Sequence, residues 1–356
     1  MAGAGAFGRN HLRVYRELEA AGAGVALVAA VEPDAARAAE AAAKYAIPVF
    51  ATVDELLAAD LKLDAATVAV PTVHHAAVAA QLLDAGLEAG LDLLVEKPLA
   101  ATLAEADDLM SRAERGGRIL QPGHLERFNP AVLAVEPQLR RPMFFESHRL
   151  SIFTPRALDV DVVLDLMIHD LDIVLTFAAS PVREVRAVGL PILSPKVDIS
   201  NVRVEFESGC VANFTASRVS TERVRKLRFF EPRQYVSIDY ARQDVLVIGV
   251  NGGSAAALPP EIQAAMAAGK GDAALLAKLA AGGAAPGLSF SKPPVTAGEP
   301  LRLEIVSFLE AVRTRRAPKV TAQQGRNALA LALEIQVAMA AHAKRAGLED
   351  FFKPGV

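Results

Sequence analysis

A carboxylate and an imidazole share one face of a predicted helix near the middle of the chain. Asp165 and His169 lie four residues apart in an apolar segment with helical spacing, and Asp172 follows three residues later. An imidazole beside a carboxylate is a common acceptor for the proton of an alcohol. A core histidine and the beginning of a metal site are alternatives, but zinc needs further ligands and the sequence has no cluster of Cys and His. The acids in this apolar segment favour an acid–base pair.

A lysine stands at the end of a second apolar run. Glu96, Lys97 and Pro98 follow residues 91–95, which are predicted to form a parallel strand, and ligands bind at the carboxyl ends of such strands. A partly desolvated lysine can share its proton with a hydroxyl group that is being oxidised. A surface lysine in a salt bridge is the alternative interpretation. A cis peptide bond before Pro98 would fix the direction of Lys97.

A polar turn lies where the first part of the chain passes into the second. His124, Arg127 and Asn129 fall within residues 121–130, and junctions between domains often line clefts. A guanidinium group binds pyrophosphate well, and the amide of Asn129 suits a sugar hydroxyl. We therefore expect substrate contacts from this turn, with a solvated turn as the alternative.

The chain begins with the spacing Gly-x-Gly-x-x-Gly, formed by Gly3, Gly5 and Gly8. The first glycine permits a tight turn, the second lets the backbone approach a pyrophosphate, and the third lets a helix pack closely on a sheet. An apolar run then ends at Glu32, whose carboxylate can bind both hydroxyls of an adenosine ribose. The pattern predicts a dinucleotide site for NAD, and Arg37 keeps NADP open.

Contacts with this cofactor are expected along one edge of the predicted sheet. The segment 71–75 follows a predicted strand and contains two histidines, of which one is expected at the cofactor and the other at a helix start. The residues expected to bind the cofactor are Gly3, Gly5, Ala6, Phe7, Gly8, Glu32, Pro71, Thr72, His75, Glu96 and Lys97. The residues expected to bind the substrate are His124, Arg127, Asn129, Asp165 and His169, and no metal is expected.

Composition argues against several classes of protein. The 38 basic and 41 acidic residues give a net charge of -3, which does not support binding to nucleic acid or to anionic membranes. The single cysteine, Cys210, cannot form an internal disulfide, and the first residues lack the pattern of a signal peptide. No apolar run approaches the roughly 20 residues of a membrane span. We expect a cytoplasmic enzyme.

The first 120 residues alternate short apolar runs with Ala-rich amphipathic stretches, which predicts βαβ units and a doubly wound parallel sheet. The predicted strands cover residues 25–31, 65–70, 91–95 and 118–121. The predicted helices cover residues 11–20, 33–45, 53–57, 75–89 and 103–115, and Thr102 with Glu105 makes a capping box for the last. Only two residues precede the glycine turn, so we expect a truncated first strand, either from a start assigned too late or with a cost in stability and cofactor binding.

Later residues change to longer runs with strand character. The predicted strands cover residues 143–150, 182–190, 200–207, 210–218, 224–230, 235–239 and 244–250, with a hairpin turn at Ser208-Gly209. They predict a large, mostly antiparallel open sheet in an α+β domain, with one face on helices and the other at a subunit interface. Residues 252–298 are expected to form an irregular excursion with a short helix, followed by helices over 301–314 and 323–346.

We therefore expect three parts in the chain. Residues 1–122 form a dinucleotide-binding domain, residues 123–322 form a domain for substrate binding and oligomerisation, and residues 323–356 form a helix that packs on the first domain.

These motifs together resemble a known family. The glycine turn followed by His11, the Glu-Lys-Pro triplet at Lys97, and the Asp165/His169 pair occur in the order found in the Gfo/Idh/MocA oxidoreductases, and the resemblance extends over residues 3–341. It implies an N-terminal Rossmann domain, a C-terminal α/β domain with a large open sheet, a tightly bound nicotinamide cofactor, and a homodimer or homotetramer. The family's catalytic lysine corresponds to Lys97, and its Asp/His pair corresponds to Asp165 and His169.

Within that family, residues 123–130 and 158–170 look like the branch of UDP-N-acetylglucosamine 3-dehydrogenases. Those enzymes oxidise the C3 hydroxyl of the sugar to a ketone, which an aminotransferase uses on the way to a diamino sugar for lipid A. The resemblance implies that His169 takes the hydroxyl proton, Asp165 orients the imidazole, and Lys97 stabilises the alkoxide. The alternatives are an inositol or free-sugar dehydrogenase with the same residues, and an NAD-binding module without catalysis.

Overall fold

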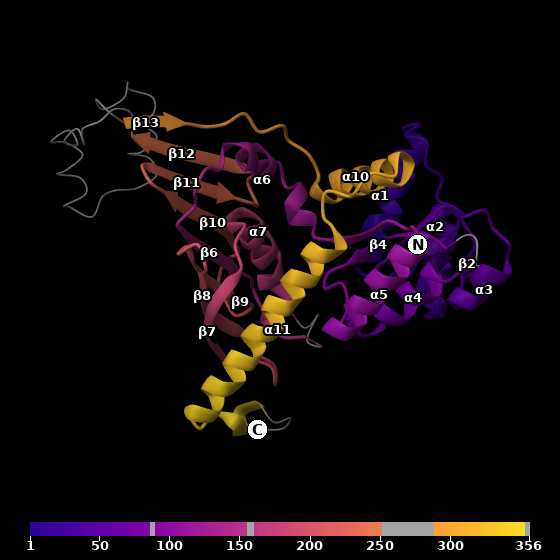
Figure 1. Ribbon diagram of the computed structural model, residues 1–356. Coiled ribbons are helices and arrows are strands. Elements are labelled where there is room, and N and C mark those ends of the chain that lie inside the picture. The colour runs from indigo at the N-terminus through magenta and orange to yellow at the C-terminus, as the bar shows by residue number, and fades with distance from the viewer. Residues whose placement is uncertain (86–89, 155–159, 251–287, 353–356) are drawn as a thin grey trace. The chain divides into compact units, whose positions relative to one another are not determined.

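The computed structural model describes residues 1–85, 90–154, 160–250 and 288–352 (Figure 1). The chain divides into two compact units. Unit 1 consists of Met1–Phe128, Leu171–Leu175 and Gly298–Glu334, and unit 2 consists of Asn129–Asp170, Thr176–Ala297 and Ile335–Val356. Residues 298–322 thus count with unit 1, whereas the sequence analysis assigns them to the second domain. The excursion expected from residue 252 lies outside the described residues up to residue 287.

Unit 1 is built on parallel strands, as expected. They are β1 (Ala30–Val31), β2 (Val49–Phe50), β3 (Ala65–Val68), β4 (Asp92–Glu96) and β5 (Leu120–Gly123). β1 pairs with β2, and β4 lies between β3 and β5, all in parallel. Ala2 joins the two groups because it bridges in parallel to both Val31 and Val68. The residues before the glycine turn therefore occupy the centre of this sheet.

The strand at β1 is shorter than the sequence predicts. The apolar run covers residues 25–31, but only Ala30 and Val31 have ladder pairing. On its inner side, the Val31 N–H donates to the Met1 carbonyl and the Gly3 N–H donates to the Val31 carbonyl, each at 2.8 Å. Strand pairing requires a neighbouring strand, and here Met1–Gly3 supplies it only for the end of the run. The predicted strand over 25–31 is therefore wrong in length.

The helices of unit 1 follow the predicted pattern, except that the helix predicted over residues 75–89 ends at Leu83. They are α1 (Gly8–Ala20), α2 (Ala35–Tyr45), α3 (Val53–Ala58), α4 (His75–Leu83), α5 (Leu103–Arg115) and α10 (Pro300–Thr314), with 3-10 turns η1 (Thr72–His74) and η2 (Leu125–Phe128). The predicted capping box of α5 is confirmed: the Thr102 hydroxyl accepts from the Glu105 N–H, and the Glu105 carboxylate accepts from the Thr102 N–H. α10 counts with unit 1 because its Ile305 and Phe308 lie in the same core as Leu12 of α1.

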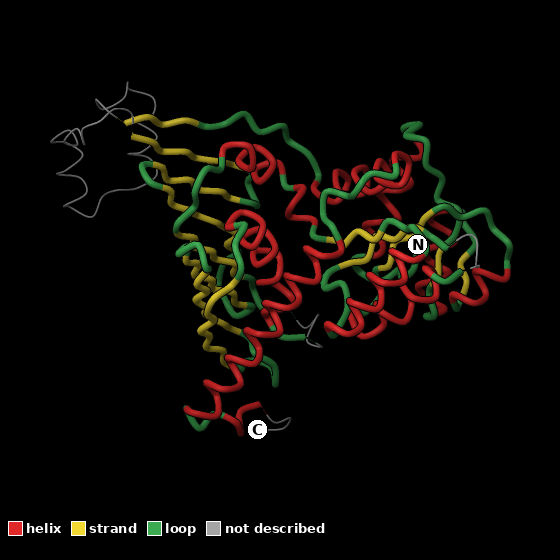
Figure 2. Tube along the Cα trace, in the orientation of Figure 1, coloured by secondary structure: helices red, strands yellow, loops and turns green. Residues whose placement is uncertain are grey.

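Unit 2 is built on one large sheet (Figure 2). Its eight strands run in the order β13-β12-β11-β10-β6-β9-β8-β7. Their bounds are β6 (Phe144–Leu150), β7 (Val182–Leu190), β8 (Ile199–Phe206), β9 (Val211–Ser217), β10 (Val224–Glu231), β11 (Gln234–Asp239), β12 (Asp244–Val250) and β13 (Leu288–Ser291). All neighbours are antiparallel except β6 and β9, which are parallel. The predicted mostly antiparallel sheet is confirmed, with the predicted turn at Ser208-Gly209 between β8 and β9.

Side chains alternate along the strands of this sheet. In β6, Phe145 and Arg149 are buried, whereas Phe144 and Glu146 are partly exposed. Such alternation is typical of a sheet with one face on a core. Figure 1 shows α6 beside β11 and β12, and these elements are in contact. The helical elements not yet given are α6 (Pro130–Val135), η3 (Glu136–Gln138), the π-helical turn η4 (Val163–Met167), α7 (Ile168–Ala178), α11 (Ala322–Arg345) and η5 (Glu349–Phe352).

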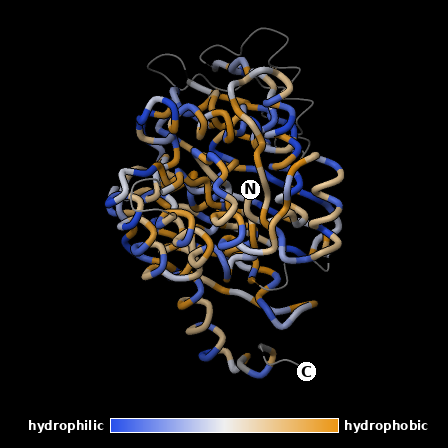
Figure 3. Tube along the Cα trace, turned by 90° about the vertical axis from the view of Figure 1, so that its right-hand side faces the viewer, coloured by the Kyte–Doolittle hydropathy of each residue, from blue (hydrophilic) through white to orange (hydrophobic). Residues whose placement is uncertain are grey.

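Two helices contribute residues to both units. α7 gives Leu171–Leu175 to unit 1, and α11 gives its residues up to Glu334 to unit 1 and the remainder to unit 2. In Figure 3 the turns of α11 nearest the C-terminus alternate blue and pale segments, and Met339 and Ala343 are buried there. Across the described ranges, every helix is too short or too polar to cross a membrane.

The core of unit 2 provides a test of this packing. Phe229 is buried, and its ring lies 5.6 Å from that of Phe145 and 6.1 Å from that of Phe177. Phe229→Ala removes these contacts and leaves a cavity, so we expect it to lower the free energy of unfolding by about 3 to 5 kcal/mol in urea denaturation. Val337→Ala, at a position that is 70% exposed, is the control and should change little. Equal effects of the two substitutions would contradict this packing.

Candidate active site

The three glycines of the first turn have different surroundings. Gly3 has φ +92°, and a Cβ built on it would lie 2.6 Å from the Ala69 carbonyl oxygen. A Cβ on Gly8 would overlap the Gly3 carbonyl, whereas a Cβ on Gly5 would meet nothing within 4 Å. Gly3 and Gly8 are therefore required by the packing of the protein itself. The space beside Gly5 is open at the start of α1, which is where a pyrophosphate would bind.

Glu32 links the end of β1 to this turn. Its Oε2 accepts a hydrogen bond from the Ala4 N–H at 2.8 Å, and its Oε1 accepts from the Asp34 N–H at 3.0 Å and from the Arg37 guanidinium at 2.9 Å. Burial by itself would raise the pKa of Glu32, but these hydrogen bonds together lower it below its ordinary value. An ionised carboxylate is therefore fixed beside the glycine turn. The open space at Gly5 and this carboxylate fit a dinucleotide with a free ribose.

The other predicted cofactor residues of unit 1 lie around the same sheet edge. Ala6 and Phe7 are exposed in the turn, Pro71 is exposed, and Thr72 is partly exposed. Side chains at these positions are therefore accessible to a ligand, and their contacts with a cofactor stay predictions.

Lys97 directly follows β4. Its side chain is partly exposed, and the peptide bond between Lys97 and Pro98 is cis. Glu96, which precedes it, is buried and its Oε1 lies 2.7 Å from Nε2 of the buried His11. Gly123 of β5 pairs with Glu96 of β4, and a Cβ on Gly123 would lie 3.0 Å from the Glu96 Cα and carboxylate. Glu96, the residue before Lys97, is therefore closely packed between His11 and Gly123.

His75 contacts the residue that follows Lys97. Its Nδ1 is 2.7 Å from the Pro98 carbonyl oxygen and its Nε2 is 2.9 Å from the Val70 carbonyl oxygen. Burial lowers the pKa of His75 below its ordinary value, although both carbonyls act in the opposite direction. One histidine of the segment 71–75 is predicted at the cofactor. The structure gives the ring of His75 two backbone partners, and His74 is exposed.

A group of buried polar side chains lies in unit 1 near Lys97. Arg127 Nη1 is 3.7 Å from the Asp172 Oδ1, and both side chains are almost fully buried. His124 is buried as well; burial lowers its pKa, the Asp172 charge opposes this, and the charges of Arg127 and Lys97 add to it. His124, Arg127 and Asp172, which the sequence analysis singled out, are thus brought together with Lys97 in one unit.

Glu304 of α10 is a member of this group that sequence reasoning missed. It is fully buried, and neither carboxylate oxygen has a hydrogen-bond partner among the described residues. Burial, and after it the negative charges of Glu96 and Asp172, raise the pKa of Glu304 well above its ordinary value. A signal was available, because Glu304 falls on the apolar stripe of α10 that includes Leu301 and Ile305. An acid within such a stripe indicates a buried carboxyl group.

The segment that carries Asp165 and His169 contains a π-helical turn. Asp165 lies in η4 and His169 in the first turn of α7, and both are partly exposed. The Asp161 carboxylate accepts hydrogen bonds from the N–H groups of residues 163 and 164, and Gln336 of α11 donates to its other oxygen at 2.7 Å. The regular α-helix expected over this segment is wrong in its first turn. Turns of this kind are frequent at functional sites.

Two further contacts of unit 2 fix residues next to the predicted site. Asp170, directly after His169, receives two hydrogen bonds from Arg149 of β6, at 2.7 and 3.0 Å. The Asn129 side chain donates to the Tyr240 carbonyl at 3.0 Å and accepts from the Ala131 N–H at 3.1 Å, so it caps α6. The sugar contact expected of Asn129 stays a prediction.

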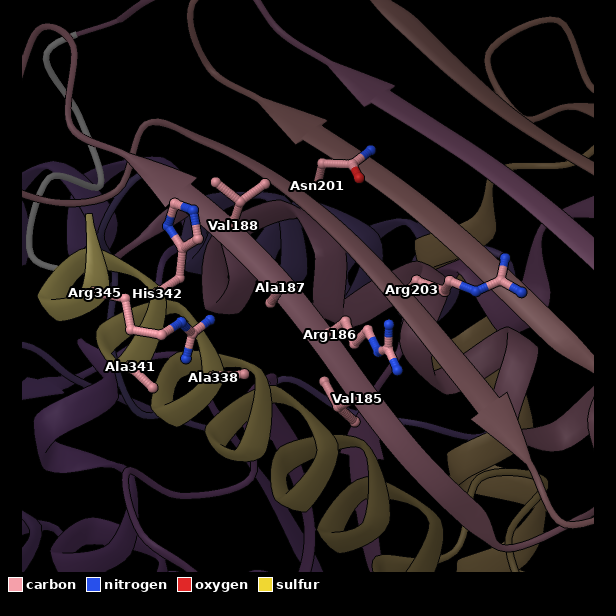
Figure 4. A pocket seen from close by; sticks show the side chains of 10 residues that line it. All are labelled: Val185, Arg186, Ala187, Val188, Asn201, Arg203, Ala338, Ala341, His342 and Arg345. Atoms are coloured by element: carbon pink, nitrogen blue, oxygen red, sulfur yellow. The ribbon is translucent and has the colours of Figure 1, made fainter.

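Lys97 belongs to unit 1, and Asp165 and His169 belong to unit 2. Their convergence on one substrate atom therefore stays a prediction. A groove of about 540 Å³ runs along β7, β8 and the end of α11 within unit 2 (Figure 4), and its lining contains none of the predicted site residues. Within the described ranges, no three Asp, Glu, His or Cys side chains are grouped as metal ligands.

Two family models match the chain. Residues 1–124 match an oxidoreductase family with an NAD-binding Rossmann fold, GFO_IDH_MocA, and residues 131–236 match the GFO/IDH/MocA C-terminal domain. The UDP-N-acetylglucosamine 3-dehydrogenase of Acidithiobacillus ferrooxidans is 32% identical over 344 residues, which cover 96% of this chain and 97% of that protein. A solved structure of that enzyme has a TM-score of 0.80 at 31% identity, with 96% of each chain covered.

Two further likenesses are more limited, one in the share of the chains that aligns and the other in sequence identity. An inositol 2-dehydrogenase of Leifsonia xyli is 32% identical over 191 residues, which cover 51% of this chain and 54% of that protein. The WlbA dehydrogenase of Chromobacterium violaceum, solved with NADH and UDP-GlcNAcA, has a TM-score of 0.72 at 15% identity, covering 96% of this chain and 93% of that chain. The second likeness concerns the fold alone.

The buried carboxyl of Glu304 gives a test by pH. The pKa of this group is raised in the folded protein, so the wild type loses stability as the pH rises from 4.5, the ordinary value, through the raised value. Glu304→Gln keeps the shape of the neutral acid and does not titrate. We expect the melting temperature of the variant, relative to wild type, to be higher at about pH 8 than at about pH 5.

Glu310→Gln serves as the control for this comparison, because Glu310 lies exposed on the same helix. Its difference from wild type should be the same at both pH values. If the difference in melting temperature between Glu304→Gln and wild type is also the same at both pH values, the carboxyl of Glu304 is not held in its neutral form.

Proposed function

The chain belongs to the Gfo/Idh/MocA oxidoreductase family, and from that membership we propose that it oxidises a secondary hydroxyl of a nucleotide sugar with NAD. The substrate proposed is UDP-N-acetylglucosamine and the carbon is C3. One observation carries the choice of substrate: the identity of 32% to a protein named for this reaction extends over 96% of the chain, whereas the inositol 2-dehydrogenase aligns over 51%. The reaction is proposed to take place in the cytoplasm, ahead of an aminotransferase step toward a diamino sugar for lipid A.

NAD is proposed as the cofactor in preference to NADP. The ionised carboxylate of Glu32 would accept hydrogen bonds from the ribose hydroxyls and would repel a 2′-phosphate. The Arg37 guanidinium, which could otherwise attract that phosphate, donates to Glu32 at 2.9 Å. When bound, NAD would supply the acceptor for the hydride from the sugar carbon. The cofactor-binding residues proposed are those of the glycine turn together with Glu32, Pro71, Thr72, His75, Glu96 and Lys97.

The chain's own residues would handle the proton and the charge. We propose that His169 accepts the hydroxyl proton at a ring nitrogen and that Asp165, four residues earlier, orients the ring. The Lys97 ammonium would donate a hydrogen bond to the substrate oxygen as negative charge develops on it. His124 and Arg127 would contact the nucleotide sugar. Lys97 is partly exposed, and the residues on both sides of it are held by His11 and His75, which supports this role.

Turnover with purified substrates tests the proposal. We expect the wild type to reduce NAD with UDP-N-acetylglucosamine, followed by NADH absorbance, and to reduce NADP much less. Lys97→Met keeps the length of the side chain without its charge, and we expect it to lower kcat by about 100- to 1000-fold while NADH binding is retained. Lys62→Met is the control, because Lys62 is exposed in unit 1.

The same assay separates the alternatives. Oxidation of inositol without oxidation of the nucleotide sugar would favour the free-sugar dehydrogenase, and UDP-sugars would then fail to raise the melting temperature. NADH binding without turnover of either class would favour the module without catalysis. A Lys97→Met variant as active as wild type would refute the role given to Lys97.

We also propose a homodimer or homotetramer that assembles through the partly exposed face of the large sheet. An apolar row crosses this face, since Phe230 pairs with both Phe144 and Tyr235, Phe144 pairs with Val211, and Tyr235 pairs with Ile248. The Phe230 ring lies 5.4 Å from that of Phe144 and 5.2 Å from that of Tyr235. A contiguous apolar surface of this kind favours burial against a second copy.

Sedimentation velocity tests this interface. We expect the wild type to sediment as an oligomer and Phe230→Glu to sediment as a monomer, because a charge in the middle of the row would be buried without a partner. Val337→Glu, at an exposed position on α11, should leave the oligomer intact. A monomeric wild type, or a Phe230→Glu variant with the wild-type sedimentation coefficient, would refute the interface.

A further inference from the structure

We propose that two buried histidines, His11 and His75, are positioning residues that hold the backbone on either side of Lys97. His11 contacts Glu96, the residue before Lys97, and His75 contacts Pro98, the residue after it. We call these four residues the Lys97 clamp. The inference rests on the catalytic role proposed above for Lys97.

The first half of the clamp comes from the helix that follows the glycine turn. His11 Nε2 and Glu96 Oε1 are 2.7 Å apart, and the two side chains are 0% and 8% exposed. His11 lies on α1 three residues after Gly8, so its hydrogen bond ties the helix at the proposed pyrophosphate site to the end of β4. The Phe7 and His11 rings pack in a T-shaped arrangement, with centroids 5.4 Å apart. A buried hydrogen bond to a carboxylate restrains both partners strongly.

The second half of the clamp comes from the start of α4. The His75 ring lies between the Pro98 and Val70 carbonyl oxygens, at 2.7 and 2.9 Å. Val70 and Pro98 stand two and three residues beyond paired positions of β3 and β4, Val68 and Val95. One ring thus lies between the segments that leave two neighbouring strands, and in its neutral form it donates to one of the two carbonyls at a time. Its Nδ1 is the atom that contacts the segment of Lys97.

The two histidines restrain the backbone and leave the lysine side chain accessible. Glu96 is buried and Pro98 is buried, whereas the Lys97 side chain between them is partly exposed. A group fixed at both neighbours has only its own side-chain torsions left to search. Placement matters, because a shift of about 1 Å of a reacting group can cost about 100-fold in rate. The two histidine contacts are therefore suited to fixing the position from which the Lys97 side chain extends.

Substitutions that retain one ring nitrogen test this at His75. The amide nitrogen of asparagine replaces Nδ1, and that of glutamine replaces Nε2. Because Nδ1 contacts Pro98, we expect His75→Asn to keep most of kcat and His75→Gln to lose about 10- to 100-fold, with KM changed by less than about twofold.

The order should reverse at His11. There Nε2 makes the contact with Glu96, so His11→Gln should keep most of kcat and His11→Asn should lose it to a similar extent. A merely structural role predicts no such reversal, since it ranks the substitutions by packing alone. His74→Gln is the control, because His74 is exposed beside His75, and it should match wild type.

A measurement without substrate or cofactor separates this proposal from the proposed function. Amide hydrogen exchange of a peptide spanning Lys97 should be faster in His75→Gln and His11→Asn than in wild type, His75→Asn and His11→Gln. A wild type without sugar oxidation would refute the proposed function and leave this readout intact. Exchange and kcat that follow the melting temperatures of the four variants, without the reversed order, would refute the clamp.

Discussion

Parallel pairing of β3, β4 and β5 is the constraint on which the polar chemistry of unit 1 depends. The register places Val68 beside Val95 and Glu96 beside Gly123, so the segments that leave these strands begin at one edge. A single imidazole can then reach two of them, and the absence of a Cβ on Gly123 makes room for the Glu96 carboxylate. Strand pairing thus brings segments that are distant in the sequence close enough in space to form these hydrogen bonds.

Much of this arrangement follows from residue patterns. Period and turn residues predict nearly every strand of the large sheet, and Thr102 with Glu105 predicts the start of α5, because these signals are local. What sequence reasoning misses depends on neighbours that are distant in the chain. The run before Val31 has strand composition, but only its end has a neighbouring strand to pair with. The turn at Asp165 is π-helical, and the Asp161 carboxylate that accepts from its first N–H groups also accepts from the distant Gln336. Position in the sequence predicts His75 at the cofactor, but it does not predict the two backbone carbonyls that the ring contacts.

Burial changes the charges that the sequence suggests. The formal net charge of -3 counts every carboxyl as ionised and every histidine as neutral. In unit 1, Glu304 has a raised pKa and His124 a lowered one, so both favour the neutral form, and the Arg127 and Asp172 charges lie 3.7 Å apart. Isolated buried charges are costly, so neutral forms and paired charges are the stable solutions. Of these groups, only Glu304 departs from the formal count, because burial favours the form without the negative charge that the count assigns to it.

The parallel pairing of β6 with β9 has a consequence for how unit 2 comes together. Between these two strands the chain passes through η4, α7, β7 and β8 before it returns. A ladder between segments so far apart in sequence closes a large loop, and loop closure of this kind slows folding. The acid and the imidazole at 165 and 169 lie inside that loop. Their surroundings on β6 and β9 are therefore among the non-local features of the domain, and a nascent chain can acquire them only after β9 has been synthesised.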